Sequence, residues 1–117
     1  QEAEKMLTDA RVLEGSGVFA LVLECVPDSL AREMTRKLPI PTIGIGAGPD
    51  CDGQVLVIDD LLGLSKGPAP KFVKRYAELR PVAVDAVKRY VAEVQGGKYP
   101  GPEHTYTSPK ASTADKH

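Results

Sequence analysis

The stretch that decides the fold is Val18-Phe19-Ala20-Leu21-Val22-Leu23-Glu24-Cys25-Val26, which is apolar at every position but one. A strand with one face in water alternates apolar and polar side chains, whereas a strand covered on both faces is apolar throughout. This run therefore predicts a strand that is buried on both faces, in a parallel sheet covered by helices.

Amphipathic segments lie on either side of this strand. Before it, residues 3–13 carry apolar side chains at spacings of three and four, which predicts a helix that ends at Gly15 and Gly17. After it, Pro27-Asp28-Ser29 is suited to the first turn of a second helix, where Asp or Ser can cap free N–H groups. That helix continues with apolar residues at every fourth position, through residue 38.

Further elements are expected along the rest of the chain. A second apolar strand begins at residue 42 and runs into a glycine-rich loop, and a third covers residues 54–58. Two helices are expected at about residues 69–79 and 81–94, followed by coil. The last residues, 107–117, are small and polar, and we expect them to be disordered.

This order of elements predicts only part of an α/β fold. Strands that alternate with helices build a parallel sheet. Three strands alone would leave two long apolar edges without partners, which natural proteins avoid. No capping residue or strand precedes the first helix either. We therefore expect residues 1–106 to be a portion of one larger domain, a (β/α)₈ barrel or, as a second possibility, a doubly wound sheet.

Composition and charge exclude several classes of function. The 15 Lys and Arg residues nearly balance the 16 Asp and Glu residues, so the charge gives no reason to expect nucleic acid or an acidic membrane as partner. No apolar run approaches the ~18 residues that span a membrane, and the start does not resemble a signal peptide. Cys25 and Cys51 form neither a disulfide framework nor a zinc pattern, which fits a cytoplasmic protein.

Glu24 is the candidate for chemistry, because it stands near the end of the apolar strand. In α/β barrels, residues at the C-terminal ends of strands line the active site. A carboxylate in apolar surroundings resists ionisation, which suits a general base. The alternative is a structural carboxylate that faces solvent or pairs with a buried Arg. Its neighbour Cys25 is expected to be a buried small residue rather than a nucleophile.

The glycines Gly44, Gly46 and Gly48 form a second candidate site. Their spacing departs from the G-x-G-x-x-G of dinucleotide-binding loops, and a strand rather than a helix follows. We favour a steric role, in which the missing side chains let the backbone approach a ligand or a neighbour closely. The loop is still expected to line a substrate site. The Asp50–Gly53 segment is interpreted as a tight turn rather than a calcium loop.

Four motifs in this order resemble the C-terminal part of the ketopantoate hydroxymethyltransferase family. They are Leu23-Glu24-Cys25-Val26-Pro27, Ile43-Gly44-Ile45-Gly46-Ala47-Gly48, Asp52-Gly53-Gln54-Val55-Leu56-Val57, and Gly97-Lys98-Tyr99-Pro100 followed by Glu103-His104. The resemblance covers roughly residues 1–106. It implies a (β/α)₈ TIM barrel of the phosphoenolpyruvate/pyruvate type, to which this chain would contribute the last three strands and the C-terminal helices.

The resemblance also implies an activity. The family transfers a hydroxymethyl group from 5,10-methylenetetrahydrofolate to 3-methyl-2-oxobutanoate, which gives 2-dehydropantoate in pantothenate biosynthesis. Magnesium (Mg²⁺) chelates the keto acid, and the Glu of the L-E-C-V-P motif, here Glu24, accepts the proton. The metal ligands lie in the N-terminal half of the family's barrel, so the resemblance places none in this chain and implies that the chain alone is inactive. It further implies a homo-oligomer, often a decamer.

Two other functions stay open at this point. One is a keto-acid lyase or mutase of the same barrel superfamily. The other is a non-catalytic nucleotide-binding module built on the glycine loop.

Overall fold

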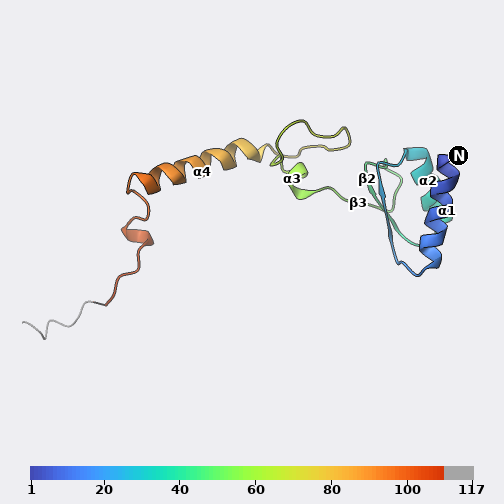
Figure 1. Ribbon diagram of the computed structural model, residues 1–117, viewed down its shortest axis with the longest axis horizontal. Coiled ribbons are helices and arrows are strands. Elements are labelled where there is room, and N and C mark those ends of the chain that lie inside the picture. Colours follow the sequence, from blue (N-terminus) through green and yellow to red (C-terminus); the bar gives the residue numbers. More distant parts are fainter. Residues whose placement is uncertain (110–117) are drawn as a thin grey trace, which may run out of the picture. The chain divides into compact units, whose positions relative to one another are not determined.

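The computed structural model describes residues 1–109, which contain a parallel sheet of three strands in the order β1-β2-β3 (Figure 1). Helix α1 (Glu2–Gly15) precedes β1 (Leu21–Glu24), and α2 (Asp28–Lys37) connects β1 to β2 (Thr42–Ile45). A loop then leads to β3 (Gly53–Gln54). Both strand pairs are parallel, as the alternation of strands and helices predicts.

The rest of the chain is helical or irregular. A short helix, α3 (Ile58–Leu61), and an irregular stretch lead to α4 (Leu79–Gln95), and a turn of 3₁₀ helix follows at Pro102–His104. The chain divides into two compact units, Gln1–Leu79 and a second that begins at Arg80. The sheet and the first three helices belong to the first unit.

Helices α1 and α2 pack against one face of the sheet (Figure 1). The buried core combines residues of both helices with β1 and the segments that follow β1, α2 and β2: Ala10, Leu23, Val26, Leu30, Ala31, Met34, Leu38 and Ala47. Side chains alternate along a strand, so Val22 and Glu24 project from the opposite face. Both are exposed, Val22 by 59%.

The prediction that β1 is buried on both faces is therefore wrong for this chain. Within the first unit, helices cover one face, and the second face of the apolar strand is open. The strand is also shorter than the predicted residues 18–26. Phe19 lies before it and is 88% exposed. At the other end, Cys25 has φ +53°, a left-handed conformation that bends the chain away from the strand direction.

That bend also corrects the expectation for Cys25. Its backbone N–H still donates to the Ile45 carbonyl over 2.9 Å, which is the last bond of the ladder between β1 and β2. Its side chain, however, is exposed rather than buried. The simple alternation of a strand does not continue past a residue with positive φ.

The third predicted strand, residues 54–58, is wrong in its bounds, since β3 covers Gly53–Gln54 and shares only Gln54 with it. The Val55 N–H donates to the Gly44 carbonyl over 3.0 Å, and no further ladder bond to β2 follows in the described part of the chain. Val55 and Val57 are about half exposed, at 46% and 53%. β3 is an edge strand, so a neighbouring strand on one side only provides hydrogen bonds that could lengthen it. The chain instead enters α3 at Ile58.

The predicted helix at residues 69–79 is absent. Prolines at positions 68 and 70 disfavour helical geometry in the residues before them. The Val73 N–H donates to the Pro70 carbonyl over 3.0 Å in a turn, and the end of the segment bonds to α3 and the residue after it. The N–H groups of Tyr76 and Leu79 donate to the carbonyls of Leu61 and Leu62, over 2.8 Å and 3.1 Å. The backbone of residues 77–78 lies directly against Gly63, which has φ +68° and no side chain to block this close approach.

The other elements confirm the sequence pattern. Helices α1 and α2 and strand β2 form where they are expected, and α4 matches the helix predicted at about residues 81–94. Helix α2 begins at Asp28, after the N-cap residue Pro27, and has no side-chain capping bond, so the predicted cap by Asp28 or Ser29 is wrong. The predicted disorder of residues 107–117 falls largely outside the described residues.

Candidate functional site

A groove of about 880 Å³ lies beside the ends of β1 and β2. Parallel strands end at the same edge of a sheet, and ligands of open α/β sheets bind at that edge. The groove is lined by residues from the ends of both strands, from the start of α2, from β3 and from the irregular stretch before α4: Cys25, Val26, Pro27, Asp28, Gly46, Gly48, Pro49, Gln54, Lys71 and Phe72.

Two of the predicted glycines line this groove, and each lies against a specific side chain. An ideal Cβ on Gly46 would be 2.9 Å from two ring atoms of Phe72, and one on Gly48 would be 2.6 Å from the Cβ of Asp28. Both glycines also have positive φ, +70° and +80°. Only glycine combines this backbone conformation with such close neighbours.

Gly44 serves a similar purpose inside the sheet. An ideal Cβ there would be 2.9 Å from the Sγ of Cys51, so the turn after β2 can fold back over the strand. Gly44 does not itself line the groove. These contacts support the steric interpretation of the glycines. The groups that approach their backbone closely are side chains of this same chain.

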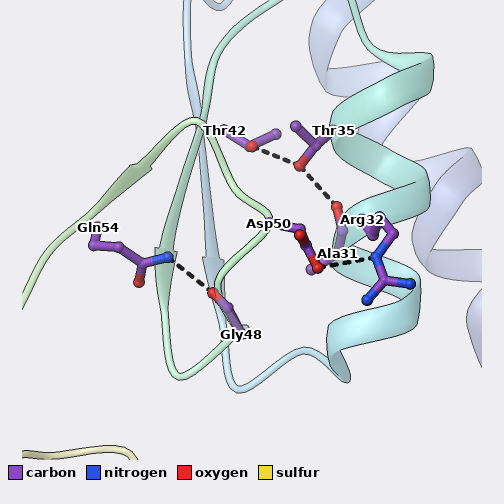
Figure 2. A network of polar contacts seen from close by, with 7 residues as sticks. All are labelled: Ala31, Arg32, Thr35, Thr42, Gly48, Asp50 and Gln54. Atoms are coloured by element: carbon purple, nitrogen blue, oxygen red, sulfur yellow. Dashed lines mark hydrogen bonds and ion pairs between the residues drawn. The ribbon is translucent and has the colours of Figure 1, made fainter.

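Polar contacts hold the loop between β2 and β3 in place, as Figure 2 shows. The side-chain amide of Gln54 donates to the Gly48 carbonyl over 2.8 Å. Arg32 of α2 forms an ion pair of 2.9 Å with Asp50. The loop is thus tied to β3 on one side and to α2 on the other, which fixes the wall of the groove that Gly46 and Gly48 form.

A second polar cluster anchors the same loop to the start of β2. Thr42 is fully buried, and the Oδ2 of Asp52 accepts hydrogen bonds from the Thr42 N–H over 2.8 Å and from its hydroxyl over 3.3 Å. The hydroxyls of Thr35 and Thr42 are 2.8 Å apart (Figure 2). The Asp50–Gly53 segment is therefore a turn whose carboxylates bond to neighbouring protein groups.

Glu24 does not itself line the groove. It lies opposite Ile45 in the register of β1 and β2, and the alternation of side chains along the strand directs it away from its buried neighbour Leu23. It borders a smaller cavity of about 170 Å³, together with residues of α1 and α2. The next residue, Cys25, already lines the groove. The apolar surroundings expected around Glu24 are absent in this chain, where its side chain is exposed.

Sequence reasoning missed three groove residues with distinctive chemistry: Lys71, Phe72 and Gln54. Lys71 and Phe72 fall within the helix predicted at about residues 69–79, although the prolines at positions 68 and 70 are a signal for a loop there. Gln54 was interpreted as a strand residue only. Asp28 was predicted to cap α2, and the structure places it in the groove wall instead.

Residues 1–109 contain no group of three or more His, Cys, Asp or Glu side chains that could hold a metal ion. No helix in this part of the chain is long and apolar enough to cross a membrane.

Comparison with known proteins identifies the family. Residues 1–102 match the family described as ketopantoate hydroxymethyltransferase. The chain belongs to the ketopantoate hydroxymethyltransferase family. Among its relatives are proteins named 3-methyl-2-oxobutanoate hydroxymethyltransferase from Pelobacter propionicus, 58% identical over 106 residues, and from Prosthecochloris aestuarii, 60% identical over 106 residues.

The match covers nearly all of this chain but a minor part of each relative. It includes 91% of the chain in both comparisons, against 39% of the Pelobacter protein and 38% of the Prosthecochloris protein. A hydroxymethyltransferase of this family from Moorella thermoacetica, 60% identical over 105 residues, gives the same proportion, 39%. The chain thus spans about two fifths of the length of the curated relatives it matches.

Proposed function

We propose that this chain is part of an enzyme that transfers a hydroxymethyl group from 5,10-methylenetetrahydrofolate to 3-methyl-2-oxobutanoate, giving 2-dehydropantoate. The family supports the reaction class, since the relatives carry the name of that activity. The observation that carries the role of this chain is the position of Glu24, at the C-terminal end of a parallel strand on the face that α1 and α2 leave open.

The open face also supports a place in a larger barrel. In a (β/α)₈ barrel, helices cover the outer face of the sheet, and the inner face is filled by side chains from all the strands. Here α1 and α2 cover one face, and the other presents Val22 together with Glu24. We propose that this second face is the barrel interior, completed by the portion that the relatives have in addition, and that residues 1–106 belong to that single domain.

Glu24 then acts as the proton acceptor. It removes the proton from C3 of 3-methyl-2-oxobutanoate, and the electron pair of the broken C–H bond moves onto the ketone oxygen as an enolate. The enolate carbon then forms a C–C bond to the methylene carbon of the donor. Both C–N bonds of that carbon break, one water supplies the hydroxyl oxygen, and tetrahydrofolate leaves with the C3 proton and one water proton on its two nitrogens. Further strands that extend the sheet and close it around the open face would give Glu24 the apolar surroundings that raise the basicity of a carboxylate. The described residues do not fit a magnesium site. The Mg²⁺ implied by the resemblance would need ligands from outside this chain.

The alternatives receive less support. The loop after β2 leads into β3 rather than into a helix, so it lacks the helix N-terminus that cradles phosphates in dinucleotide-binding folds. The names of the relatives favour a hydroxymethyltransferase over a lyase or mutase of the same superfamily. The homo-oligomer, decameric by the resemblance, remains a prediction.

Exchange of the C3 proton with deuterium tests this proposal, because it requires the base but no one-carbon donor. The enzyme is completed by joining this chain to the N-terminal portion of the Prosthecochloris relative. We expect Glu24→Gln to abolish exchange in the completed enzyme while its circular dichroism is unchanged. Glu4→Gln, an exposed carboxylate of α1, is the matched control and should exchange normally. Exchange that persists in Glu24→Gln would refute the role of Glu24.

A further inference from the structure

We propose that the groove of about 880 Å³ binds the one-carbon donor, holding a flat heteroaromatic ring against Phe72 and a carboxylate-bearing tail at Lys71. This inference rests on the proposed function, in which one substrate is a reduced folate with a pterin ring and a glutamate tail. It assigns binding residues in this chain to that substrate. The groove is formed entirely by residues of the first unit, so this chain contains all of the walls described here.

Phe72 offers a flat apolar surface in the groove. One side of its ring lies against the backbone of Gly46, where a Cβ would be only 2.9 Å from the ring atoms. The residue is nevertheless 37% exposed, so the contact leaves part of the ring free. A ring that is held on one side and accessible on the other is suited to stacking against a planar ligand.

Lys71 places a positive charge at the same groove. Its side chain is exposed and has no ion-pair partner among residues 1–109. The other cation near this loop, Arg32, is already paired with Asp50. An exposed lysine beside an aromatic ring fits a ligand that joins a ring to a carboxylate, because the ammonium attracts the carboxylate with little demand on its exact position.

The carboxylate of Asp28 favours a ring with paired N–H groups as the ligand and disfavours a phosphate. It lies at the start of α2 and lines the groove, its Cβ pressed against Gly48. A helix N-terminus attracts phosphate, but a carboxylate at that position repels it. A carboxylate accepts hydrogen bonds from paired N–H groups instead. The 2-amino and ring N–H groups of a pterin form such a pair, so the wall at Asp28 favours a pterin over a nucleotide.

Binding to the 117-residue chain tests the inference directly. Equilibrium dialysis would use three probes: 5-formyltetrahydrofolate, tetrahydropterin without the tail, and ATP. We expect 5-formyltetrahydrofolate to bind more tightly than tetrahydropterin, and ATP not to bind. Binding of ATP in preference to the folate, or no binding of either pterin to a chain with native circular dichroism, would overturn the proposal.

Variants separate the ring from the tail. Phe72→Leu should weaken both pterins about fivefold through lost stacking, and Asp28→Asn should weaken both about tenfold through a lost charge-assisted bond. Lys71→Gln should weaken only the probe with a tail, about threefold and less at high salt. The matched controls are Phe19→Leu and Lys66→Gln, an exposed Phe and an exposed Lys outside the groove, which should leave affinity unchanged.

Equal effects in the groove variants and their controls would place the ligand elsewhere. The completed enzyme gives a second measurement that does not depend on the stability of the isolated chain. There, Lys71→Gln and Phe72→Leu should raise the KM for methylenetetrahydrofolate, and the two control variants should not. Exchange at C3 of the keto acid reports on the proposed function without any donor. Failure of the groove assignment and failure of the reaction assignment are therefore distinguishable.

Discussion

The ring of Phe72 occupies the space that a side chain on Gly46 would fill, with two ring atoms 2.9 Å from an ideal Cβ at that glycine. This contact joins the irregular stretch before α4 to the end of β2, which are 26 residues apart in the sequence. No regular hydrogen-bond ladder holds residues 71–72, so the fit of an aromatic ring on a bare backbone positions one wall of the groove.

Gly46→Ala should therefore destabilise the chain in two ways. Alanine resists the φ of +70°, at about 1 kcal/mol, and its methyl group would push Phe72 outward, at about 1–3 kcal/mol more. Gly17→Ala is the control, because Gly17 has φ +98° but no heavy atom within 4 Å of a Cβ. Urea unfolding of both variants measures the difference. Equal losses in the two variants would show that Phe72 does not constrain Gly46.

Asp52 and Asp50 lie in the same turn but bind different partners, one buried and one exposed. The Oδ2 of Asp52 accepts from the buried Thr42, whereas Asp50 pairs with Arg32 at the surface, where both side chains are 38–56% exposed. Asp52→Ala leaves the N–H of Thr42 without its partner and should cost about 1–3 kcal/mol. Asp50→Ala removes an exposed ion pair and should cost about 0–1 kcal/mol. Urea midpoints of the two variants give the comparison, and the reverse order would contradict it.

The elements with a strong apolar period could be predicted from the sequence. Helix α2 forms where expected, and the predicted apolar positions Leu30 and Met34 in it, with Leu38 directly after it, are all buried. Helix α4 also forms from its valine spacing, although none of its residues is buried. Local periodicity specifies a helix whether or not its apolar face finds a partner in the same chain.

The predictions from the sequence were wrong where contacts between distant residues determine the secondary structure. The segment at residues 69–79 has apolar residues at helical spacing, but the N–H groups of its second half that would close a helix, at positions 76 and 79, donate to the carbonyls of Leu61 and Leu62. The third predicted strand is apolar over the four residues 55–58, yet the ladder forms at Gly53–Gln54, because a strand needs neighbours that no local pattern provides. Lys71 and Phe72 were missed as groove residues for the same reason: their position depends on Gly46.

Cys25 tests whether the bend after β1 is strained. Its φ of +53° is unfavourable for any residue with a Cβ, and more so for a β-branched one. We expect Cys25→Val to lose about 1–2 kcal/mol relative to the parent chain, and Cys25→Gly to be nearly neutral, since relief of strain offsets the greater entropy of the unfolded chain. Urea unfolding under reducing conditions measures both. A valine variant as stable as the glycine variant would show that the bend relaxes easily.

The ion pair of Glu33 and Lys37 on α2 predicts a pH dependence with a definite sign. The hydrogen bond from the Lys37 ammonium, and then its charge, lower the pKa of Glu33 in the folded chain. Between the lowered pKa and the ordinary one of about 4.3, the unfolded chain binds a proton that the folded chain does not. The contribution of the pair is thus present at neutral pH and is lost as the pH falls through the lowered pKa. Glu33→Gln should make the urea midpoint less sensitive to acid between about pH 5 and pH 3. Glu4→Gln, which removes an exposed carboxylate without such a pair, is the control, and an acid sensitivity equal in both variants would contradict the prediction.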